Sequence, residues 1–255
     1  MPDPRLLVDE HLSAGAELAL DEGQARHVGT VLRLDIGAAL RVFNARDGEW
    51  RALVTERAKR GMRVRVEALL RPARAAPDLD LLFAPVKRQA TDLIVEKATE
   101  LGVARIRPVV TQRTIAETVR IERLNAIARE AAEQTERFDA PDILAPVALA
   151  KALDGWDAAR PLIFCDEQGA EGGEEGRAQP IAEALAASPN LVAHKAGGRL
   201  ALLIGPEGGF TREERAMLRG RAFVIAVSLG PRILRAETAA IAALTIIQAV
   251  WGDWR

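Results

Sequence analysis

Two glycine-containing segments near the C-terminus carry the residue types best suited to binding a ligand. Residues 204–210 read IGPEGGF, and residues 228–239 read SLGPRILRAETA. Each segment follows a run of apolar residues and precedes a stretch with a helical pattern. Glycine allows the backbone to approach a ligand closely, and open α/β sheets bind ligands just beyond the carboxyl ends of their strands. The two segments therefore predict a ligand site; the alternative is two ordinary strand-to-helix turns.

The residues of the first segment indicate what kind of ligand would fit. The segment lacks the Lys-Ser/Thr pair of a P-loop, and its glycines do not have the GxGxxG spacing of a dinucleotide site. Glu207 would repel phosphate groups. A carboxylate among close backbone amides suits a ligand with positive charge and with hydroxyl or amine donors. S-adenosylmethionine fits this description, because it carries a sulfonium, an ammonium and a ribose but no phosphate.

Several segments together resemble a known family. The two glycine-containing segments are similar to the cofactor-binding signature of the SPOUT methyltransferases. Five further segments resemble the RsmE-type 16S rRNA uracil-N3 methyltransferases: Arg26–Val28, Val31–Leu34, Glu96–Val103, Gln112–Thr114 and Glu130–Gln134. The resemblance covers nearly the whole chain in order. It departs from the usual family pattern at Thr135–Arg137 and at Val86–Gln89, which lie on the expected substrate side.

This resemblance implies a fold, a cofactor and a reaction. The fold would be α/β, with a small PUA-like β-barrel followed by a SPOUT domain that has a parallel sheet and a deep trefoil knot. The cofactor would be S-adenosyl-L-methionine, and the product would be uracil methylated at N3 of a specific uridine in 16S rRNA of the small ribosomal subunit. The residues expected around the cofactor are Ile204, Gly205, Pro206, Glu207, Gly208, Gly209, Ser228, Leu229, Gly230, Ile233, Leu234, Arg235, Glu237, Thr238 and Ala239.

Methylation at N3 requires help from charged side chains. A neutral N3–H is a poor nucleophile, and a nearby cation favours the anion that remains once its proton leaves. Arg235 is the first candidate for this cation, and Arg113 is the second. Arginine stays protonated, so it would orient the uracil and stabilise negative charge. Glu207 or Glu237 would orient the arginine or take the proton; alternatively, Glu207 is a solvated loop residue and Glu237 a favourable acid at a helix start.

The chain divides into two predicted domains. Two prolines and several small residues at positions 71–77 interrupt the patterns, so residues 1–73 and residues 77–255 are expected to fold separately. The first part contains short alternating segments and an Asp47-Gly48 hairpin signal. In the second part, near-continuous apolar strands alternate with amphipathic helices, which predicts a parallel sheet covered on both faces. The expected strands are Leu79–Val86, Arg105–Val110, Pro161–Cys165, Leu200–Ile204 and Phe223–Val227, and the expected helices are Gln89–Leu101, Ile121–Glu136, Pro180–Ala187, Arg212–Arg219 and Thr238–Trp251. Thr211 and Glu214 have the spacing of a capping box at the start of the fourth of these helices.

Local charge indicates where RNA would bind. Eight basic residues and only two acids lie between Arg51 and Arg74, although the whole chain has a net charge of -1. Arginine binds phosphate oxygens in pairs, so this basic strip predicts an RNA-docking face; a solvated strand edge is the alternative. The residues expected to contact RNA are Arg26, Arg33, Arg51, Arg60, Arg63, Arg65, Lys87, Arg88 and Arg137.

Composition narrows the class of protein further. The chain has 255 residues, 49% of them hydrophobic, without the ~18-residue apolar run of a membrane span, so a soluble cytoplasmic protein is expected. Cys165 falls in a predicted buried strand, and the three histidines are scattered, so no metal is expected. Residues 171–176 read as an acidic solvent loop.

The last helix is apolar on more than one face, which predicts a homodimer. A ribose 2′-O methyltransferase and a non-catalytic RNA-binding protein are the alternative functions.

Overall fold

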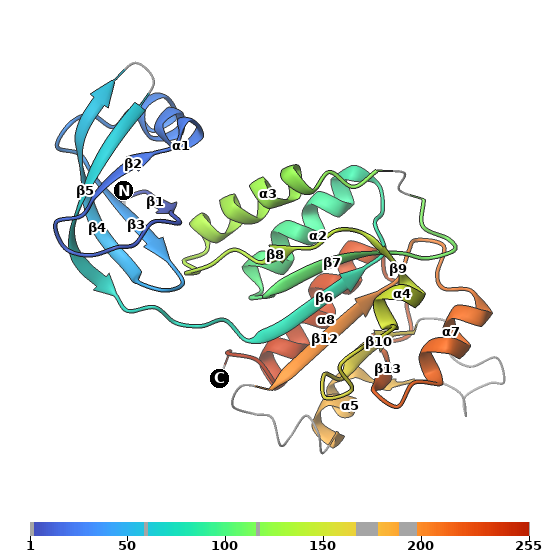
Figure 1. Ribbon diagram of the computed structural model, residues 1–255. Coiled ribbons are helices and arrows are strands. Elements are labelled where there is room, and N and C mark those ends of the chain that lie inside the picture. Colours follow the sequence, from blue (N-terminus) through green and yellow to red (C-terminus); the bar gives the residue numbers. More distant parts are fainter. Residues whose placement is uncertain (1–2, 59–60, 116–117, 167–177, 189–197, 255) are drawn as a thin grey trace. The chain divides into compact units, whose positions relative to one another are not determined.

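The structure is a computed structural model that describes residues 3–58, 61–115, 118–166, 178–188 and 198–254 (Figure 1). By its internal contacts the chain divides into two compact units. The first contains residues 1–75 and 132–139, and the second contains residues 76–131 and 140–255. The division after residue 75 falls in the proline-containing break of the sequence. The predicted acidic loop at residues 171–176 and the candidate Arg60 lie outside the described residues.

The first unit is built on a five-stranded sheet. Its strand order is β1 (Arg5–Leu7), β3 (Ala39–Asn44), β4 (Gly48–Ala58), β5 (Gly61–Arg71) and β2 (Glu17–Leu20). The pairing is parallel between β1 and β3 and antiparallel elsewhere. Alternate residues of β4 and β5 are buried in one core, namely Ala52, Val54, Val64 and Val66. Two five-residue helices that the sequence did not indicate, α1 (Glu22–Arg26) and η1 (His27–Val31), follow β2.

A tight turn joins β3 to β4 at the predicted Asp47-Gly48 signal. Gly48 has a φ of +85°, which a side chain would strain, and a Cβ there would collide with the backbone of Arg71. The Asp47 carboxylate accepts hydrogen bonds from the backbone N–H of Leu12 at 2.9 Å and from Asn44 Nδ2 at 3.1 Å. Asp47 thus connects the turn to the irregular segment around Leu12.

A buried ion cluster surrounds Glu49 at the start of β4. The Glu49 side chain has no exposed surface, and its carboxylate contacts Arg41 Nη1 at 2.8 Å, Arg5 Nε at 3.5 Å and the guanidinium of Arg71. Three positive charges therefore offset one buried negative charge. Because Arg71 is occupied by Glu49, it does not belong to a free basic strip, contrary to the pattern read from the sequence.

Residues 132–139 join the first unit through the same arginines. Arg5 Nη1 donates to the carbonyl oxygens of Ala132 and Glu133 at 3.1 and 3.0 Å, and the Glu133 carboxylate accepts from the N–H of Leu7 at 3.0 Å. Glu136 pairs with Arg71 at 2.8 Å. The end of the Glu130–Gln134 segment therefore packs against β1.

The second unit contains a parallel sheet, as predicted. The strand order is β11 (Gln179–Pro180), β13 (Val224–Ser228), β10 (Leu162–Cys165), β12 (Arg199–Ile204), β6 (Asp78–Phe83), β7 (Arg105–Val110) and β8 (Asp142–Ile143), with β9 (Val147–Ala148) paired to the end of β7. All these pairs are parallel. The predicted strand Leu79–Val86 was too long at its end. β6 stops at Phe83 because Pro85 cannot donate to the ladder and the N–H of Val86 instead donates to Thr91 Oγ1.

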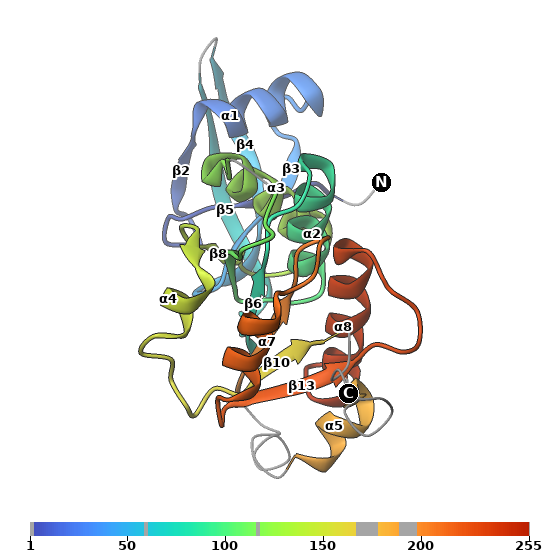
Figure 2. The ribbon, with the colours of Figure 1, turned by 90° about the vertical axis from the view of Figure 1, so that its right-hand side faces the viewer.

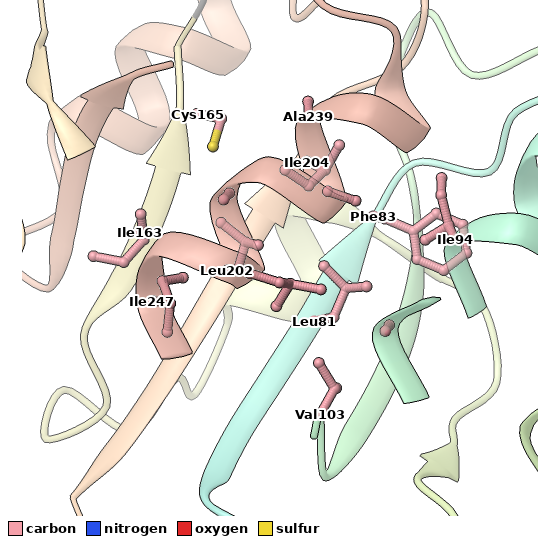
Figure 3. Close-up of a cluster of buried hydrophobic side chains, with 14 of the residues drawn as sticks. Leu81, Phe83, Ile94, Val103, Ile163, Cys165, Leu202, Ile204, Ala239 and Ile247 are labelled. Atoms are coloured by element: carbon pink, nitrogen blue, oxygen red, sulfur yellow. The ribbon is translucent and has the colours of Figure 1, made fainter. Parts of the chain in front are cut away.

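Helices cover both faces of this sheet (Figures 1 and 2). One face, drawn in Figure 3, packs its alternate residues such as Leu81 and Leu202 against four helices: α2 (Arg88–Glu100), α3 (Ile121–Gln134), α5 (Ile181–Ala187) and α8 (Ala236–Val250). The other face packs Leu82 and Leu203 against α4 (Leu149–Leu153) and α7 (Arg212–Arg219). Cys165 is buried in the first of these cores. The burial of both faces explains the continuous apolar runs of the strands.

Two kinds of feature are absent from the part of the chain that the structure describes. No described helix is long and apolar enough to cross a membrane. Within the same ranges, no three His, Cys, Asp or Glu side chains are grouped so that they could hold a metal ion.

Candidate active site

The first glycine-containing segment leaves the carboxyl end of β12 and is held in place by an aromatic side chain. A Cβ on Gly205 would lie 2.6 Å from the ring of Phe210, so only glycine fits there. Phe210 itself packs edge-on against Phe164 of β10, with ring centroids 5.1 Å apart. Gly209 has a φ of +68°. The segment is therefore a rigid turn whose Glu207 and Gly208 face solvent.

A capping box fixes the end of this turn, as the sequence predicted. Thr211 Oγ1 accepts from the N–H of Glu214 at 3.2 Å, and Glu214 Oε2 accepts from the N–H of Thr211 at 2.9 Å. The other oxygen of the same carboxylate, Oε1, accepts from the N–H of Gln112 at 2.8 Å. One buried carboxylate thus joins the glycine turn to the Gln112–Thr114 segment that follows β7.

Arg113 makes a second link between these segments. Its Nη1 donates to the carbonyl oxygen of Gly208 at 2.8 Å, and a Cβ on Gly208 would lie 3.4 Å from Arg113 Cβ. The structure therefore places Arg113 beside Glu207 and Gly208, three residues that the sequence assigned to the site. Thr111 and Thr114 close the Arg113 loop, because Thr111 N donates to Thr114 Oγ1 at 2.8 Å.

The second glycine-containing segment leaves β13 and leads into α8. Gly230 has a φ of +109°, and its N–H donates to Ser228 Oγ at 3.2 Å, which closes the loop. Arg235 is the N-cap residue of α8 and is exposed, while Glu237 lies in the first turn. Ile233 has 85% of its surface exposed, an unusual state for an apolar residue of this size. Arg235 and Ile233 are therefore both accessible to a substrate.

Two hollows lie between the glycine-containing segments and the end of β10. One, of about 50 Å³, is lined by the 228–234 loop, and the other, of about 20 Å³, by Ile204, Gly205, Pro206, Gly209, Phe210 and Ala239. Cys165 and Asp166 line both. The two segments that the sequence assigned to one ligand are therefore brought to one edge of the sheet, on either side of residues 165 and 166.

Asp166 is a site residue that the sequence reasoning missed. Its side chain is 2% exposed and its carboxylate contacts Arg215 Nε at 3.0 Å and Arg219 Nη2 at 2.7 Å. Its N–H donates to the carbonyl oxygen of Val227 at 3.0 Å. Asp166 thus fixes α7, which follows the first loop, against the strand that precedes the second. The sequence does offer one indication of its role, because Asp166 is an acid that directly follows the apolar strand Leu162–Cys165.

These features fit S-adenosylmethionine. Apolar side chains of Leu229, Ile233 and Leu234 line the larger hollow together with backbone groups, which suits a purine ring. The smaller hollow holds no more than about one water molecule, and it lies beside Gly205 and Gly209, whose missing side chains let a ligand approach the backbone closely. Glu207 supplies negative charge near a cationic ligand. No cluster of phosphate-binding cations is needed for such a molecule.

Comparison with known proteins relates both units to RNA methylation. Residues 74–248 match the family described as RNA methyltransferase domain, and residues 20–67 match the RNA methyltransferase PUA domain. A ribosomal RNA small subunit methyltransferase E from Rickettsia conorii is 31% identical over 249 residues, which cover 96% of this chain and 94% of the relative. The chain belongs to the ribosomal RNA small subunit methyltransferase E family. The first unit is accordingly the PUA-like unit of this family.

Solved structures of this family bind the expected cofactor. The methyltransferase E of Neisseria gonorrhoeae, crystallised with S-adenosyl methionine, has a TM-score of 0.82 and 27% identity and covers 99% of this chain and 100% of its own. A putative methyltransferase of Legionella pneumophila in complex with the same cofactor has a TM-score of 0.85 and 30% identity, with the same coverage. The α/β fold with a parallel sheet expected from the family resemblance is therefore confirmed.

The residues expected to contact RNA differ in their surroundings. Arg26, Arg33, Arg51, Arg63 and Arg65 are exposed in the PUA-like unit, and Lys87 and Arg88 are exposed at the start of α2. Arg63 also contacts Glu56 at 3.5 Å. Arg137 differs from the rest, because its side chain is 9% exposed and donates to Asp139 at 2.9 Å. Arg137 is therefore less accessible to a phosphate than the exposed arginines.

Proposed function

We propose that this protein uses S-adenosylmethionine to methylate uracil N3 of a specific uridine in 16S rRNA of the small ribosomal subunit. The observation that carries the proposal is the convergence of both glycine-containing segments on Cys165 and Asp166, in a chain that belongs to the methyltransferase E family over nearly its full length. A deep trefoil knot in the second unit is part of this proposal. An enzyme of ribosomal subunits would work in the cytoplasm.

The residues around the two hollows would hold the cofactor. When bound, the cofactor supplies an electrophilic methyl group. Backbone groups near Leu229, Gly230 and Leu234 would read the adenine, and the glycines of the first segment would lie beside the ribose and the amino acid chain. Asp166 would keep the two segments at a fixed separation through its contacts with α7 and β13.

Arg235 would act on the uracil. It is exposed at the end of the second segment and has no side-chain role in capping α8. A guanidinium beside the uracil would orient its carbonyl oxygens and favour the N3 anion. Arg113 is the less suitable of the two candidates, because its guanidinium already donates to Gly208. Glu207, exposed beside Arg113, is placed to orient a cation or to accept the N3 proton, and Glu237 remains the alternative.

The PUA-like unit would dock the RNA. Arg51 and Arg65 are exposed on strands whose alternate residues, Ala52, Val54, Val64 and Val66, form the core. Both arginines therefore extend from the outer face of the sheet, where a phosphate backbone could reach them. Arg26 and Arg33 add charge in the helical segment before β3.

Product analysis tests the proposed reaction. The purified protein is incubated with S-adenosylmethionine and with small ribosomal subunits from a strain that lacks the corresponding methyltransferase, and the rRNA nucleosides are analysed by mass spectrometry. We expect 3-methyluridine at one position. A methyl group on ribose, or no product on intact subunits, would overturn the proposal. Arg221→Ala is a suitable control variant, because Arg221 is exposed at the opposite end of β13 from the site.

We also propose that the protein is a homodimer through α8. One side of this helix is buried against the sheet, while Ile241, Thr245, Ile246 and Val250 remain half-exposed. An apolar side chain gains about 25 cal/mol for each Å² removed from water, so a second subunit is the natural cover for this face. Light scattering at micromolar concentration should give twice the chain mass of 27.6 kDa. A monomer would overturn this part of the proposal.

A further inference from the structure

A cavity lies between the loop that follows β6 and the segment that precedes α3, outside the cofactor hollows. Its volume is about 310 Å³, within the ~300–1,000 Å³ typical of sites for small ligands. It is the largest of the hollows described in the second unit. The described residues that line it include Pro85, Val86, Thr91, Thr118, Val119 and Leu124.

The wall of this cavity, which we call the α2 pocket, is apolar. Val86 and Leu124 are 4% and 2% exposed and belong to the core, and Val119 packs against them. Thr91 is hydrogen-bonded within the wall, because its Oγ1 donates to the carbonyl oxygen of Val86 at 3.0 Å. The hydroxyl of Thr91, the buried threonine of the wall, is therefore satisfied. An apolar planar group could enter without leaving a buried hydrogen-bonding group without a partner.

The rim of the α2 pocket is positively charged. Lys87, Arg88 and Arg120 are exposed, and among the described residues no carboxylate lies within ion-pair distance of them. The one acid that lines the pocket, Asp92, is paired with Arg123, whose Nε donates to it at 3.0 Å. The amino end of α2 has no side-chain cap and adds partial positive charge. An apolar wall with a cationic rim is complementary to a nucleotide, which combines a flat base with a negative phosphate.

Two chain segments connect the α2 pocket with the first glycine-containing segment. Ala84 N donates to the carbonyl oxygen of Ile204 at 3.0 Å, and Val86 lines the pocket two residues later. Arg113 donates to Gly208, and Ile115 lines the pocket two residues later. Two residues span at most about 7 Å of extended chain. The pocket therefore lies at the same edge of the sheet as the proposed reaction site.

We propose that the α2 pocket receives the base of an unpaired nucleotide adjacent to the methylated uridine, while Lys87, Arg88 and Arg120 contact its phosphates. The inference rests on the proposed function. A base must leave its stack before a modifying enzyme can act on it, and unstacked neighbours are the nucleotides that proteins read in RNA. The pocket would thus help to select which uridine of the rRNA enters the site.

Filling the pocket tests this proposal. In Thr118→Trp, an exposed side chain at the pocket becomes an indole that occupies the space of a base. We expect KM for small ribosomal subunits to rise about ten-fold, as loss of a base contact typically causes, with cofactor affinity unchanged within two-fold. Ala222→Trp adds the same bulk at an exposed position before β13 and should not change KM. Equal KM values in the two variants would overturn the proposal.

Charge reversal separates the phosphate contacts from the base pocket. Arg120→Glu should raise KM and also lower the salt dependence of RNA binding by about one unit of slope, whereas Thr118→Trp should leave the slope unchanged. Arg221→Glu is the matched control. If the wild-type protein forms no 3-methyluridine, the proposed function fails; if it does so and the pocket variants behave like the controls, only the α2 pocket proposal fails.

Crosslinking provides a measurement that does not depend on turnover. A photoreactive benzoylphenylalanine at position 118, in the full chain bound to small ribosomal subunits, should crosslink to rRNA immediately beside the methylated uridine, where reverse transcription would stop. A crosslink to a ribosomal protein, or to a distant region of the rRNA, would show that the pocket faces another partner and would overturn the proposal.

Discussion

Arginine is used differently in two regions of this protein. In the PUA-like unit, Arg5, Arg41 and Arg71 surround the buried Glu49 and stabilise the fold. At the ligand-binding edge of the second unit, Arg88, Arg120 and Arg235 are exposed, and no described carboxylate pairs with them. The same residue type therefore supports structure around the buried Glu49 and is available for RNA where no described carboxylate pairs with it.

The position of carboxylates decides between these two uses. A buried carboxylate requires cations, because an uncompensated charge in the protein interior is strongly destabilising. The arginines near Glu49 are consequently engaged by its carboxylate, and Arg71 is one of them although the sequence places it in a run of basic residues. A count of basic residues along the chain therefore overestimates the RNA-binding surface wherever a buried acid on a neighbouring strand pairs with some of them.

The largest expected effect comes from removing the buried acid. Glu49→Ala leaves three arginines without their partner and should lower the free energy of unfolding of the PUA-like unit by about 3–5 kcal/mol. Urea unfolding of the full chain, with hydrogen exchange of β3 to β5 to locate the loss, measures this. Glu56→Ala is the control, because the exposed Glu56–Arg63 pair should contribute at most about 1 kcal/mol. Equal shifts in the two variants would remove the distinction between the two uses of arginine.

Removing an unpaired arginine should affect catalysis rather than folding. Arg235→Ala should lower kcat by about 100- to 1,000-fold, the usual cost of losing one group that stabilises developing negative charge. Cofactor affinity, measured by calorimetry, should change by no more than a few-fold, and Arg221→Ala should behave as wild type. If cofactor binding collapses instead, Arg235 belongs to the cofactor pocket and Arg113 becomes the candidate for contact with uracil.

The turn at Asp47 gives a smaller effect that depends on pH. The side-chain hydrogen bond from Arg46 holds the pKa of Asp47 well below its ordinary value of 3.8; burial opposes this, and the N–H of Leu12 reinforces it. A depressed pKa in the folded state means that the ionised carboxylate stabilises the fold above pH ~4 and that this contribution is lost as the pH falls through the folded-state pKa. Asp47→Asn should therefore cost about 1–2 kcal/mol near neutral pH.

The pH dependence is the decisive part of this measurement. The free energies of unfolding of the wild type and Asp47→Asn should converge as the pH falls from ~4 towards the folded-state pKa, because the carboxylate is protonated first in the unfolded chain and at lower pH in the folded protein as well. Asp35→Asn, at an exposed position with a distant Arg57 partner at 3.7 Å, is the control and should show little difference at any pH. If the two proteins differ in free energy of unfolding by the same amount at all pH values, packing and not charge accounts for the lower stability of Asp47→Asn.

The smallest effects are expected for the exposed arginines of the PUA-like unit. Arg51→Glu and Arg65→Glu should each weaken binding to small ribosomal subunits and reduce the salt dependence by about one unit of slope. These two positions are easier to interpret than Arg63, because the guanidinium of Arg63 contacts Glu56 and its replacement would also remove that ion pair. Arg221→Glu controls for net charge. If affinity and slope are unchanged, the outer face of this sheet does not dock RNA, and the second unit must do so.

Regular elements of the second unit could be predicted from the sequence because their patterns are local. Continuous apolar runs marked its five main strands, and the Thr211–Glu214 capping box marked the start of α7. The short strands β8, β9 and β11, each of two residues, left no periodic pattern to recognise. Pairing partners, rather than local preference, create such strands.

Long-range contacts account for what the sequence did not reveal. Residues 132–139 join the first unit through contacts distant in sequence, such as those from Arg5, which donates to carbonyl oxygens more than 120 positions later. Asp166 contacts Arg215 and Arg219, about 50 positions later. Both glycine-containing segments were recognised, because their residue types are unusual, but the carboxylate that fixes their separation is an ordinary aspartate until the fold brings the arginines of α7 to it.

Glu214 has a consequence for how the ligand-binding edge opens and closes. One of its carboxylate oxygens accepts from Thr211 and the other from Gln112, so the turn after β12 and the segment after β7 share a single anchor. If the Glu214 carboxylate moves away from the amide of Thr211, it also moves away from the amide of Gln112. The two segments should therefore become exposed to solvent in one cooperative event, and the amide hydrogens of Thr211 and Gln112 should exchange with deuterium at matching rates although about a hundred residues separate them.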